Sequence, residues 1–237
     1  MVNLDEIKHN IHKKFEELKF QEDKHEYEAQ NKKLKSVSYF IKDYAEEFNA
    51  INAAIGVAKK TGKTVAQVLQ EWENIKNESC ALGTKTHLFG EHFVLTGENN
   101  PSNGYEEALV KFWMDLPEHL VPVTLELKMY CIKMGIAGTA DIILYNKQTN
   151  KFIIADYKTN KDLFKNFRGK RLKAPFDNLL DSPFGKYNIQ LSMYQILFEL
   201  TGYEVEDRFI IWLKPDAEYE IYYTQDLRKE INNLYNF

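Results

Sequence analysis

Apolar residues near the start of the chain recur every three or four positions. This spacing is typical of an amphipathic helix and predicts one over residues 4–19, with an apolar face of Leu4, Ile7, Ile11, Phe15 and Leu18. The next stretch, residues 19–40, mixes strand formers with turn formers and predicts a small hairpin.

A long helical pattern follows. Residues 38–98 are predicted to be mainly helical, and Thr64 is placed to cap a long helix within them. Residues 97–104, with the sequence GENNPSNG, predict a loop, and residues 105–115 a further helix.

The pattern changes to strands after Pro117. HLVPVTLELKMYCI, GIAGTADIILYN and KFIIADYKT are β-rich runs separated by turn signals such as NKQTNK, and they predict a meander. A polar, basic loop over 159–185, a helix ending at Gly202, two strands and a closing helix follow. We therefore predict one α/β domain over 1–237, with a mainly helical part (1–117) and an α/β core (118–237).

Composition narrows the class of protein. The chain is 44% hydrophobic and 28% charged, which is ordinary for a globular domain. No apolar run has the length of a membrane span and no signal peptide opens the sequence, so we expect no membrane partner and a cytoplasmic protein. Cys80 and Cys131 lack zinc-site spacing and are expected to be reduced core thiols. The net charge of −4 argues against coating nucleic acid by bulk charge, although local phosphate contacts stay open.

Two acids and a lysine stand out on neighbouring predicted strands. Asp141 lies in GTADIILY, and Asp156 and Lys158 lie in IIADYKT. Residues two apart on a strand point to one face, so Asp156 and Lys158 share a side. Converging carboxylates suit Mg²⁺ or Mn²⁺, and an adjacent ammonium can orient water or stabilise charge on a phosphate.

A surface Asp–Lys pair is the plainer interpretation of a DxK sequence. Two features favour a site. Asp156 follows the apolar run 152–155 and so emerges from a buried strand, where an unpaired acid is rare. The small residues of GxxGxAD also permit close approach of backbone or ligand.

Four short motifs occur in an order that resembles a known nuclease family. They are Gly83 to His87 in GTKTH, Gly138 to Asp141 in GTAD, Asp156–Tyr157–Lys158, and Gln190 to Tyr194 in QLSMY. This order resembles the RecB-like PD-(D/E)xK nucleases. Residues 20–225, including HEY, KSVSYFI and Trp72, are also similar to the group of mitochondrial genome maintenance exonuclease and its phage-encoded relatives. The acid before the lysine is Asp where that family more often has Glu.

The resemblance implies a restriction-endonuclease-like core, a mixed central sheet flanked by helices. It implies a catalytic Mg²⁺ or Mn²⁺ held by His87, Asp141, Asp156 and the backbone carbonyl of Tyr157. Lys158 is then expected to position the attacking water, with Gln190 and Tyr194 lining the site and contacting DNA or Lys158.

Several residues keep alternative interpretations. A lone histidine such as His87, or a pair such as Gln190 and Tyr194, also occurs as ordinary helix packing. Glu91 and Glu126 are as readily solvated or salt-bridged as functional, and His9 and His12 are expected on a solvated helix face.

The loop after the second acidic motif is rich in cations. Its expected DNA contacts, with Phe164 and Phe167 interleaved for stacking, are Lys161, Lys165, Arg168, Lys170, Arg171 and Lys173. We therefore expect a metal-dependent exonuclease acting on single-stranded DNA or DNA ends in phage-type replication, recombination or repair, with possible protein partners from those processes. A structure-selective or nicking endonuclease and a non-catalytic DNA-binding protein of this fold are the alternatives. The oligomeric state is left open.

Overall fold

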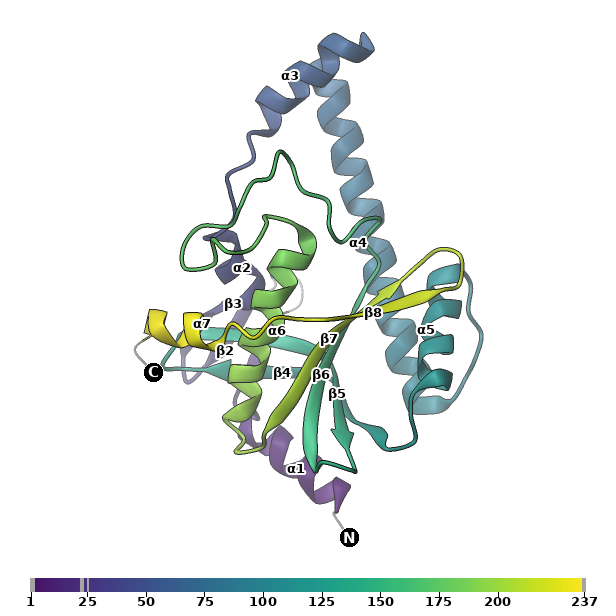
Figure 1. The fold of residues 1–237 in the computed structure, drawn as a ribbon, viewed down its shortest axis with the longest axis vertical. Coiled ribbons are helices and arrows are strands. Elements are labelled where there is room, and N and C mark those ends of the chain that lie inside the picture. The colour runs from purple at the N-terminus through teal and green to yellow at the C-terminus, as the bar shows by residue number, and fades with distance from the viewer. Residues whose placement is uncertain (1–2, 22–23, 25, 236–237) are drawn as a thin grey trace.

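The computed structural model describes residues 3–21, 24 and 26–235 of the chain. Its helices and strands, drawn in Figure 1, are α1 (Leu4–Lys14), β1 (Lys19–Gln21), β2 (Glu26–Ala29), β3 (Lys32–Ser36), α2 (Val37–Lys42), α3 (Ala50–Thr61), α4 (Val65–Thr96), α5 (Gly104–Asp115), β4 (Leu120–Cys131), β5 (Ile136–Asn146), β6 (Lys151–Lys158), α6 (Pro183–Glu199), β7 (Val205–Leu213), β8 (Tyr219–Tyr223) and α7 (Arg228–Tyr235).

One mixed sheet runs through the molecule. The predicted meander is present, because β4 pairs antiparallel with β5 and β5 antiparallel with β6. β6 then pairs parallel with β7, and β7 antiparallel with β8. The N-terminal part adds β1, β2 and β3, of which β3 runs parallel to the start of β5. The sheet is therefore not confined to residues 118–237, and the predicted hairpin is a small three-stranded unit among the described residues.

β5 changes partner along one edge, and this creates a fork in the sheet. Ile136 and Ala137 pair with β3, whereas Ile142 to Asn146 pair with β6. The residues between these pairings, 138–141, include the glycine and the aspartate of the GTAD motif. The motif therefore lies where two strands diverge from β5.

Helices cover both faces of the sheet. On one face α1, α2, α6 and α7 bury a large apolar cluster whose centre includes Ile143, Ile154 and Leu197. On the other face α5 and the end of α4 pack over Ile142, Ile153 and Phe209. The prediction of an α/β fold with a sheet flanked by helices is confirmed.

α4 is long, and its first half extends away from the sheet together with α3 (Figure 1). Thr64 begins it with a capping box: its side chain accepts the N–H of Gln67, and the Gln67 side chain accepts the N–H of Thr64. A small cluster of Ala54, Ala58 and Val68 joins α3 to α4. Within the part of the chain that the structure describes, no helix combines the length and apolar composition that a bilayer crossing requires.

Candidate metal centre

Asp141 joins β5 to β6 at the fork. Its Oδ2 accepts the backbone N–H of Tyr157 at 3.1 Å, and the carboxylate is buried. The side chain thus takes the place of a backbone acceptor at the point where the β5–β6 ladder ends. Because this hydrogen bond fixes the carboxylate relative to both strands, the direction of its second oxygen is fixed as well.

Glu126 lies next to Asp141 because the regular alternation of β4 breaks there. Its φ is 49°, in the left-handed region that non-glycine residues rarely adopt. On either side of it, Leu125 and Leu127 pack into different apolar clusters, although residues two apart on a regular strand share a face. Such strain is found most often at functional sites, and here it turns a carboxylate toward Asp141.

His87 of α4 completes the group. Its Nδ1 lies 3.3 Å from Asp141 Oδ2 and 3.7 Å from Glu126 Oε1. The other ring nitrogen, Nε2, lies 3.2 Å from the carbonyl of Tyr157. One ligand atom from each of His87, Glu126 and Asp141 lies within 4.8 Å of the others, so the three can hold a metal ion.

Two predicted ligands have other contacts. The Tyr157 carbonyl faces His87 Nε2, so it orients the imidazole in the way that metal-binding histidines are commonly oriented. Asp156 is almost fully buried, and both of its oxygens lie 2.7 Å from Lys158 Nζ. The structure therefore brings Glu126 into the trio and pairs Asp156 with Lys158.

Electrostatics at the centre are strongly coupled. Burial lowers the pKa of His87, but Asp141 and Glu126 outweigh it and raise that pKa to about 9. Burial, assisted by the nearby Asp141, raises the pKa of Asp156 well above its usual range, against the opposing effect of Lys158. In the metal-free protein the proton on His87 offsets the repulsion between the acids, and a divalent cation that displaced this proton would offset it in turn.

Gln190 and Tyr194 lie one turn apart on α6, as expected, and contact each other. Gln190 Nε2 donates to the Tyr194 hydroxyl at 2.9 Å. Tyr194 packs against Gly138, where a Cβ would meet its ring at 2.7 Å and Val37 at 2.8 Å. The glycine of the GTAD motif therefore allows α6 and α2 to approach β5 closely.

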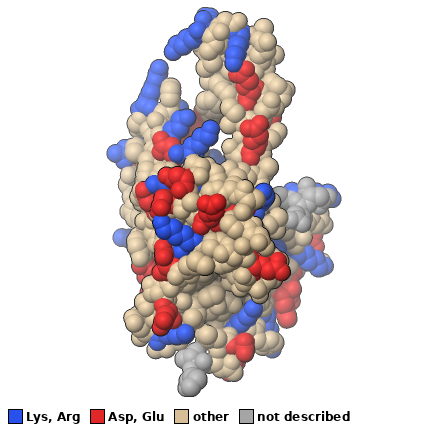
Figure 2. Space-filling view, turned by 90° about the vertical axis from the view of Figure 1, so that its right-hand side faces the viewer, with Lys and Arg blue, Asp and Glu red and all other residues tan. Residues whose placement is uncertain are grey.

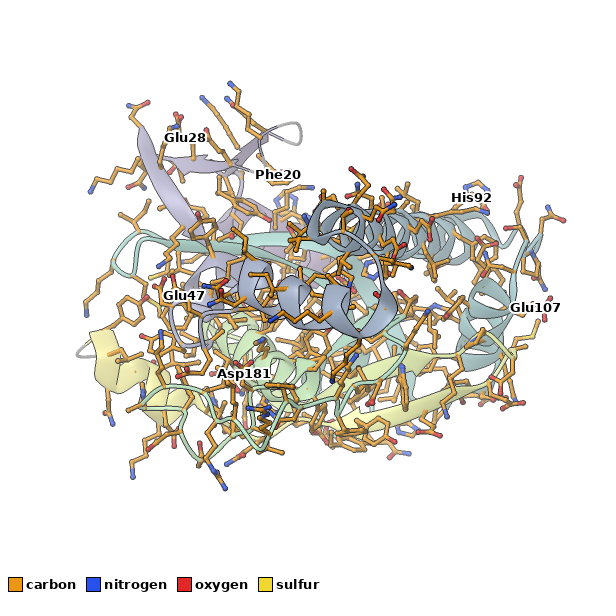
Figure 3. All side chains as sticks on the ribbon, turned by 90° about the horizontal axis from the view of Figure 1, so that it is seen from above. Phe20, Glu28, Glu47, His92, Glu107 and Asp181 are labelled. Carbon is orange, nitrogen blue, oxygen red and sulfur yellow. The ribbon has the colours of Figure 1, made fainter. Side chains whose placement is uncertain are left out.

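Two hollows open beside α4, and both are lined by Gly83 and His87. The first, of about 790 Å³, also contains Lys158, Lys161, Lys165 and Tyr187. The second, of about 840 Å³, contains Glu91, Glu126, Lys128 and Tyr194. In Figure 3, Phe20 at the second hollow and Asp181 in the loop after β6 lie on opposite sides of α3. The histidine thus stands where the two hollows meet.

The basic loop contains cations with different surroundings. Lys161 and Lys165 line the first hollow, and Arg168 stacks on Phe167 at 4.9 Å. Arg171 donates to the carbonyls of Asp177 and Asn178, while Lys173 Nζ lies 3.4 Å from the Asp43 carbonyl. The carbonyl of Lys170 accepts from Asn166 and from the backbone of Asp181. Figure 2 shows Lys and Arg side chains mixed with Asp and Glu side chains over the upper part of one face, where α3 and α4 extend.

Outside the centre, one expectation needs correction, and two other residues have contacts that the sequence did not predict. Cys80 is exposed and lines the first hollow, whereas Cys131 is buried as expected. His12 is exposed on α1 but is hydrogen-bonded to Thr124 Oγ1 at 3.0 Å. Glu91 is half-buried beside His87 in the second hollow.

No protein-family model matches the chain, and no curated protein matches it.

Proposed function

We propose that this protein is a metal-dependent nuclease of the PD-(D/E)xK superfamily, with a restriction-endonuclease-like core. The observation that supports this most is the convergence of His87, Glu126 and Asp141 with the Asp156–Lys158 pair at the fork of the sheet. A metal-binding site next to the buried ammonium of Lys158, and open to a hollow with further lysines, suits the attack of water on a phosphodiester.

The donor set fits a divalent metal. His87, Glu126 and Asp141 would hold it, and their mixture of imidazole and carboxylate suits Mn²⁺ as well as Mg²⁺. The bound metal would supply an activated water and neutralise charge on the phosphate. Asp156, which lies near Asp141, would be a further ligand if it gave up one of its contacts with Lys158.

Lys158 is proposed to act on the attacking water and on the phosphate. Its ammonium is held by Asp156 and lines the first hollow, where it can orient the attacking water and stabilise developing negative charge. Gln190 and Tyr194 support β5 from α6 through their mutual hydrogen bond and the Gly138 contact. The role proposed for Lys158 is the one that the sequence motifs imply, whereas Gln190 and Tyr194 contact each other and Gly138 in place of the expected contact with Lys158.

A ring of segments stands beside the first hollow and lines part of it, and we take this ring as support for an exonuclease. The ring consists of the loop 159–182, residues 43–49, α3, and α4 as far as Gly83, which lies close to Thr159 at the start of the loop. Its seam is made by Lys173 N–H donating to the Tyr44 carbonyl at 2.8 Å and Glu46 N–H donating to Asp181 Oδ2 at 3.0 Å. The rings of Tyr44 and Phe176 also pack at 4.9 Å.

Two segments of this ring line the hollow, α4 with Ser79 and Gly83 and the loop with Lys161 and Lys165. A strand can enter a closed ring only by its end. Lysines of the loop can contact phosphates along such a path. We therefore propose single-stranded DNA or DNA ends as substrate, in phage-type replication, recombination or repair.

The test uses end-labelled linear single strands and covalently closed single-stranded circles, each incubated with Mg²⁺, Mn²⁺ or a chelator. The linear strand should be degraded with metal and the circle should survive. Lys158→Ala, prepared in the same way, controls for contaminating nuclease.

Each alternative has its own outcome in this test. Rapid cutting of circles would establish the endonuclease on the same centre. Binding of DNA without cleavage under every metal condition would establish a non-catalytic DNA-binding protein.

A further inference from the structure

Lys158 lies between a carboxylate and an aromatic ring. On one side both oxygens of Asp156 lie 2.7 Å from its Nζ. On the other side Nζ lies 4.6 Å from the centroid of the Tyr187 ring. A cation over an aromatic face is attracted by the ring quadrupole, and more strongly where water is excluded. The Lys158 side chain is only 15% exposed.

Tyr187 is itself held in place by Asn160, which is held in turn by a residue of β7. Its hydroxyl donates to Asn160 Oδ1 at 2.8 Å. The backbone carbonyl of Asn160 accepts the indole N–H of Trp212, on β7, at 2.7 Å. The chain Trp212–Asn160–Tyr187 therefore fixes the ring relative to the sheet as well as to α6.

We propose that Tyr187 is a positioning residue for Lys158, holding the ammonium at the wall of the first hollow when Asp156 turns to the metal. The contact between the two side chains stands on its own geometry, and its effect on rate rests on the proposed nuclease function.

The choice of a ring over a second acid has a physical reason. Lysine carries its charge on a flexible four-carbon stem, so an ammonium that loses a carboxylate partner can leave its position. A second carboxylate would hold the ammonium, but it would also compete for the metal and repel the substrate phosphate. The neutral ring of Tyr187 attracts the ammonium without either cost.

The position of Tyr187 agrees with this role. Lys158, Asn160 and Tyr187 all line the first hollow. Tyr187 also precedes Gln190 by three residues and Tyr194 by seven, so the three follow one helical stripe of α6. Tyr187 and Tyr194 of this stripe lie close enough to Asp141 and Asp156 to interact with both carboxylates.

The experiment compares Tyr187→Leu, which removes the ring, with Tyr187→Phe, which keeps it. Phe184→Leu is the matched control, since Phe184 lies on the same helix and packs on Phe164 and Tyr222. Circular dichroism checks that each variant is folded. Lysine side-chain NMR of the metal-free protein is recorded for all of them, with the Lys158 signal assigned by its loss in Lys158→Met.

We expect the ring current of Tyr187 to shift the Lys158 Hε signals upfield in the native protein and in Tyr187→Phe, and this shift to vanish in Tyr187→Leu. Tyr187→Leu should also lower kcat about 100-fold with little change in KM, since a displaced reacting group costs about that much. Tyr187→Phe should restore most of the rate, and Phe184→Leu should resemble the native protein.

Two results overturn the proposal. One is a Lys158 signal that does not respond to loss of the ring, and the other is a native kcat in Tyr187→Leu. If the native protein cleaves no nucleic acid, the nuclease function fails, and the NMR comparison still decides whether Tyr187 holds Lys158.

Discussion

Lys158 places its ammonium 2.7 Å from both carboxylate oxygens of Asp156, and the pair is largely shielded from solvent. Asp156 therefore has a partner of its own, while His87, Glu126 and Asp141 offer a metal seat beside it. Binding of a metal by Asp156 would exchange part of this ion pair for a metal–oxygen contact. The lysine and the metal are thus coupled through one carboxylate.

Because of this coupling, loss of Lys158 should lower the cleavage rate without lowering the affinity for the metal. Lys158→Ala should lower cleavage at least ~100-fold, because it removes the charge that acts on the phosphate. It also frees Asp156, so Mn²⁺ affinity should stay the same or increase. Asp141→Asn should lose both. Calorimetric Mn²⁺ titration and a single-strand cleavage assay on the folded variants measure the two effects, and near-native cleavage by either variant would remove that residue from the centre.

Glu126 is expected to be a metal ligand. Glu126→Gln keeps the size of the side chain and removes its charge, so Mn²⁺ affinity should fall about 10- to 100-fold, the range seen when even supporting groups of a metal site are lost. Glu91→Gln is the matched control, because Glu91 lines the same hollow outside the trio. Equal affinities for the two variants would contradict the assignment.

The titration of His87 should make both the stability of the fold and the affinity for Mn²⁺ depend on pH. In the metal-free protein its pKa is raised to about 9, so its charged form stabilises the fold fully below about pH 6.5 and this contribution disappears as the pH rises through about 9. A metal must displace that proton from Nδ1, so apparent Mn²⁺ affinity should rise by about tenfold per pH unit up to pH 9. Urea unfolding and Mn²⁺ titration from pH 6 to 9 measure both trends.

His87→Ala should abolish the two trends, whereas His92→Ala, exposed on the same helix, should keep them. In His87→Ala, Mn²⁺-supported cleavage should also fall more than the stability of the fold, because an imidazole ligand favours Mn²⁺ over Mg²⁺. Metal titrations that match the native protein would make His87 a structural residue.

The loop cations should separate into two groups. Lys161→Met with Lys165→Met removes the lysines that line the first hollow, so single-strand binding should weaken and the slope of log K against log salt should flatten by about 0.7 per lost phosphate contact. Arg171→Met removes bonds to loop carbonyls and should act first on the protease resistance of the loop. Identical salt slopes for the double variant and the native protein would exclude these lysines from DNA contact.

Gly138 should tolerate no side chain. A Cβ there would meet Tyr194 at 2.7 Å and Val37 at 2.8 Å, so Gly138→Ala should destabilise the fold by about 1–3 kcal/mol and displace Tyr194 from Gln190. Chemical denaturation measures the first effect. Gly56→Ala, with open space around its Cβ and no left-handed φ, is the control. An equal stability for Gly138→Ala would show that α6 yields easily at this point.

Local patterns in the sequence predicted the local elements. The Thr64 cap, the β4–β5–β6 meander and α6 follow from side-chain spacing and turn residues, which act between neighbours in the chain. The parallel pairing of β3 with β5 joins segments about a hundred residues apart, and no short pattern encodes it.

The sequence left the role of Glu126 open and did not single out Tyr187, and the two cases have different causes. Glu126 reaches Asp141 through a left-handed φ and a broken alternation, whereas a strand pattern assumes regular alternation. Tyr187 lies outside the QxxxY motif, although its place three residues before Gln190 is a helical signal that could have identified it. Asp141 and Lys158 were found because the motif order names them directly.

The seam at Tyr44 and Lys173 has a consequence for how the proposed selectivity for ends arises. The enclosure that these segments form beside the first hollow is closed there by hydrogen bonds and a ring contact, with no covalent bond between the loop 159–182 and residues 43–49. Opening it would convert the enclosure into a horseshoe through which the middle of a strand can enter sideways. The selectivity for strand ends over circles would then depend on whether the enclosure is closed. A few weak contacts between residues about 130 positions apart would decide this, while the chemistry at the metal-binding site would stay the same.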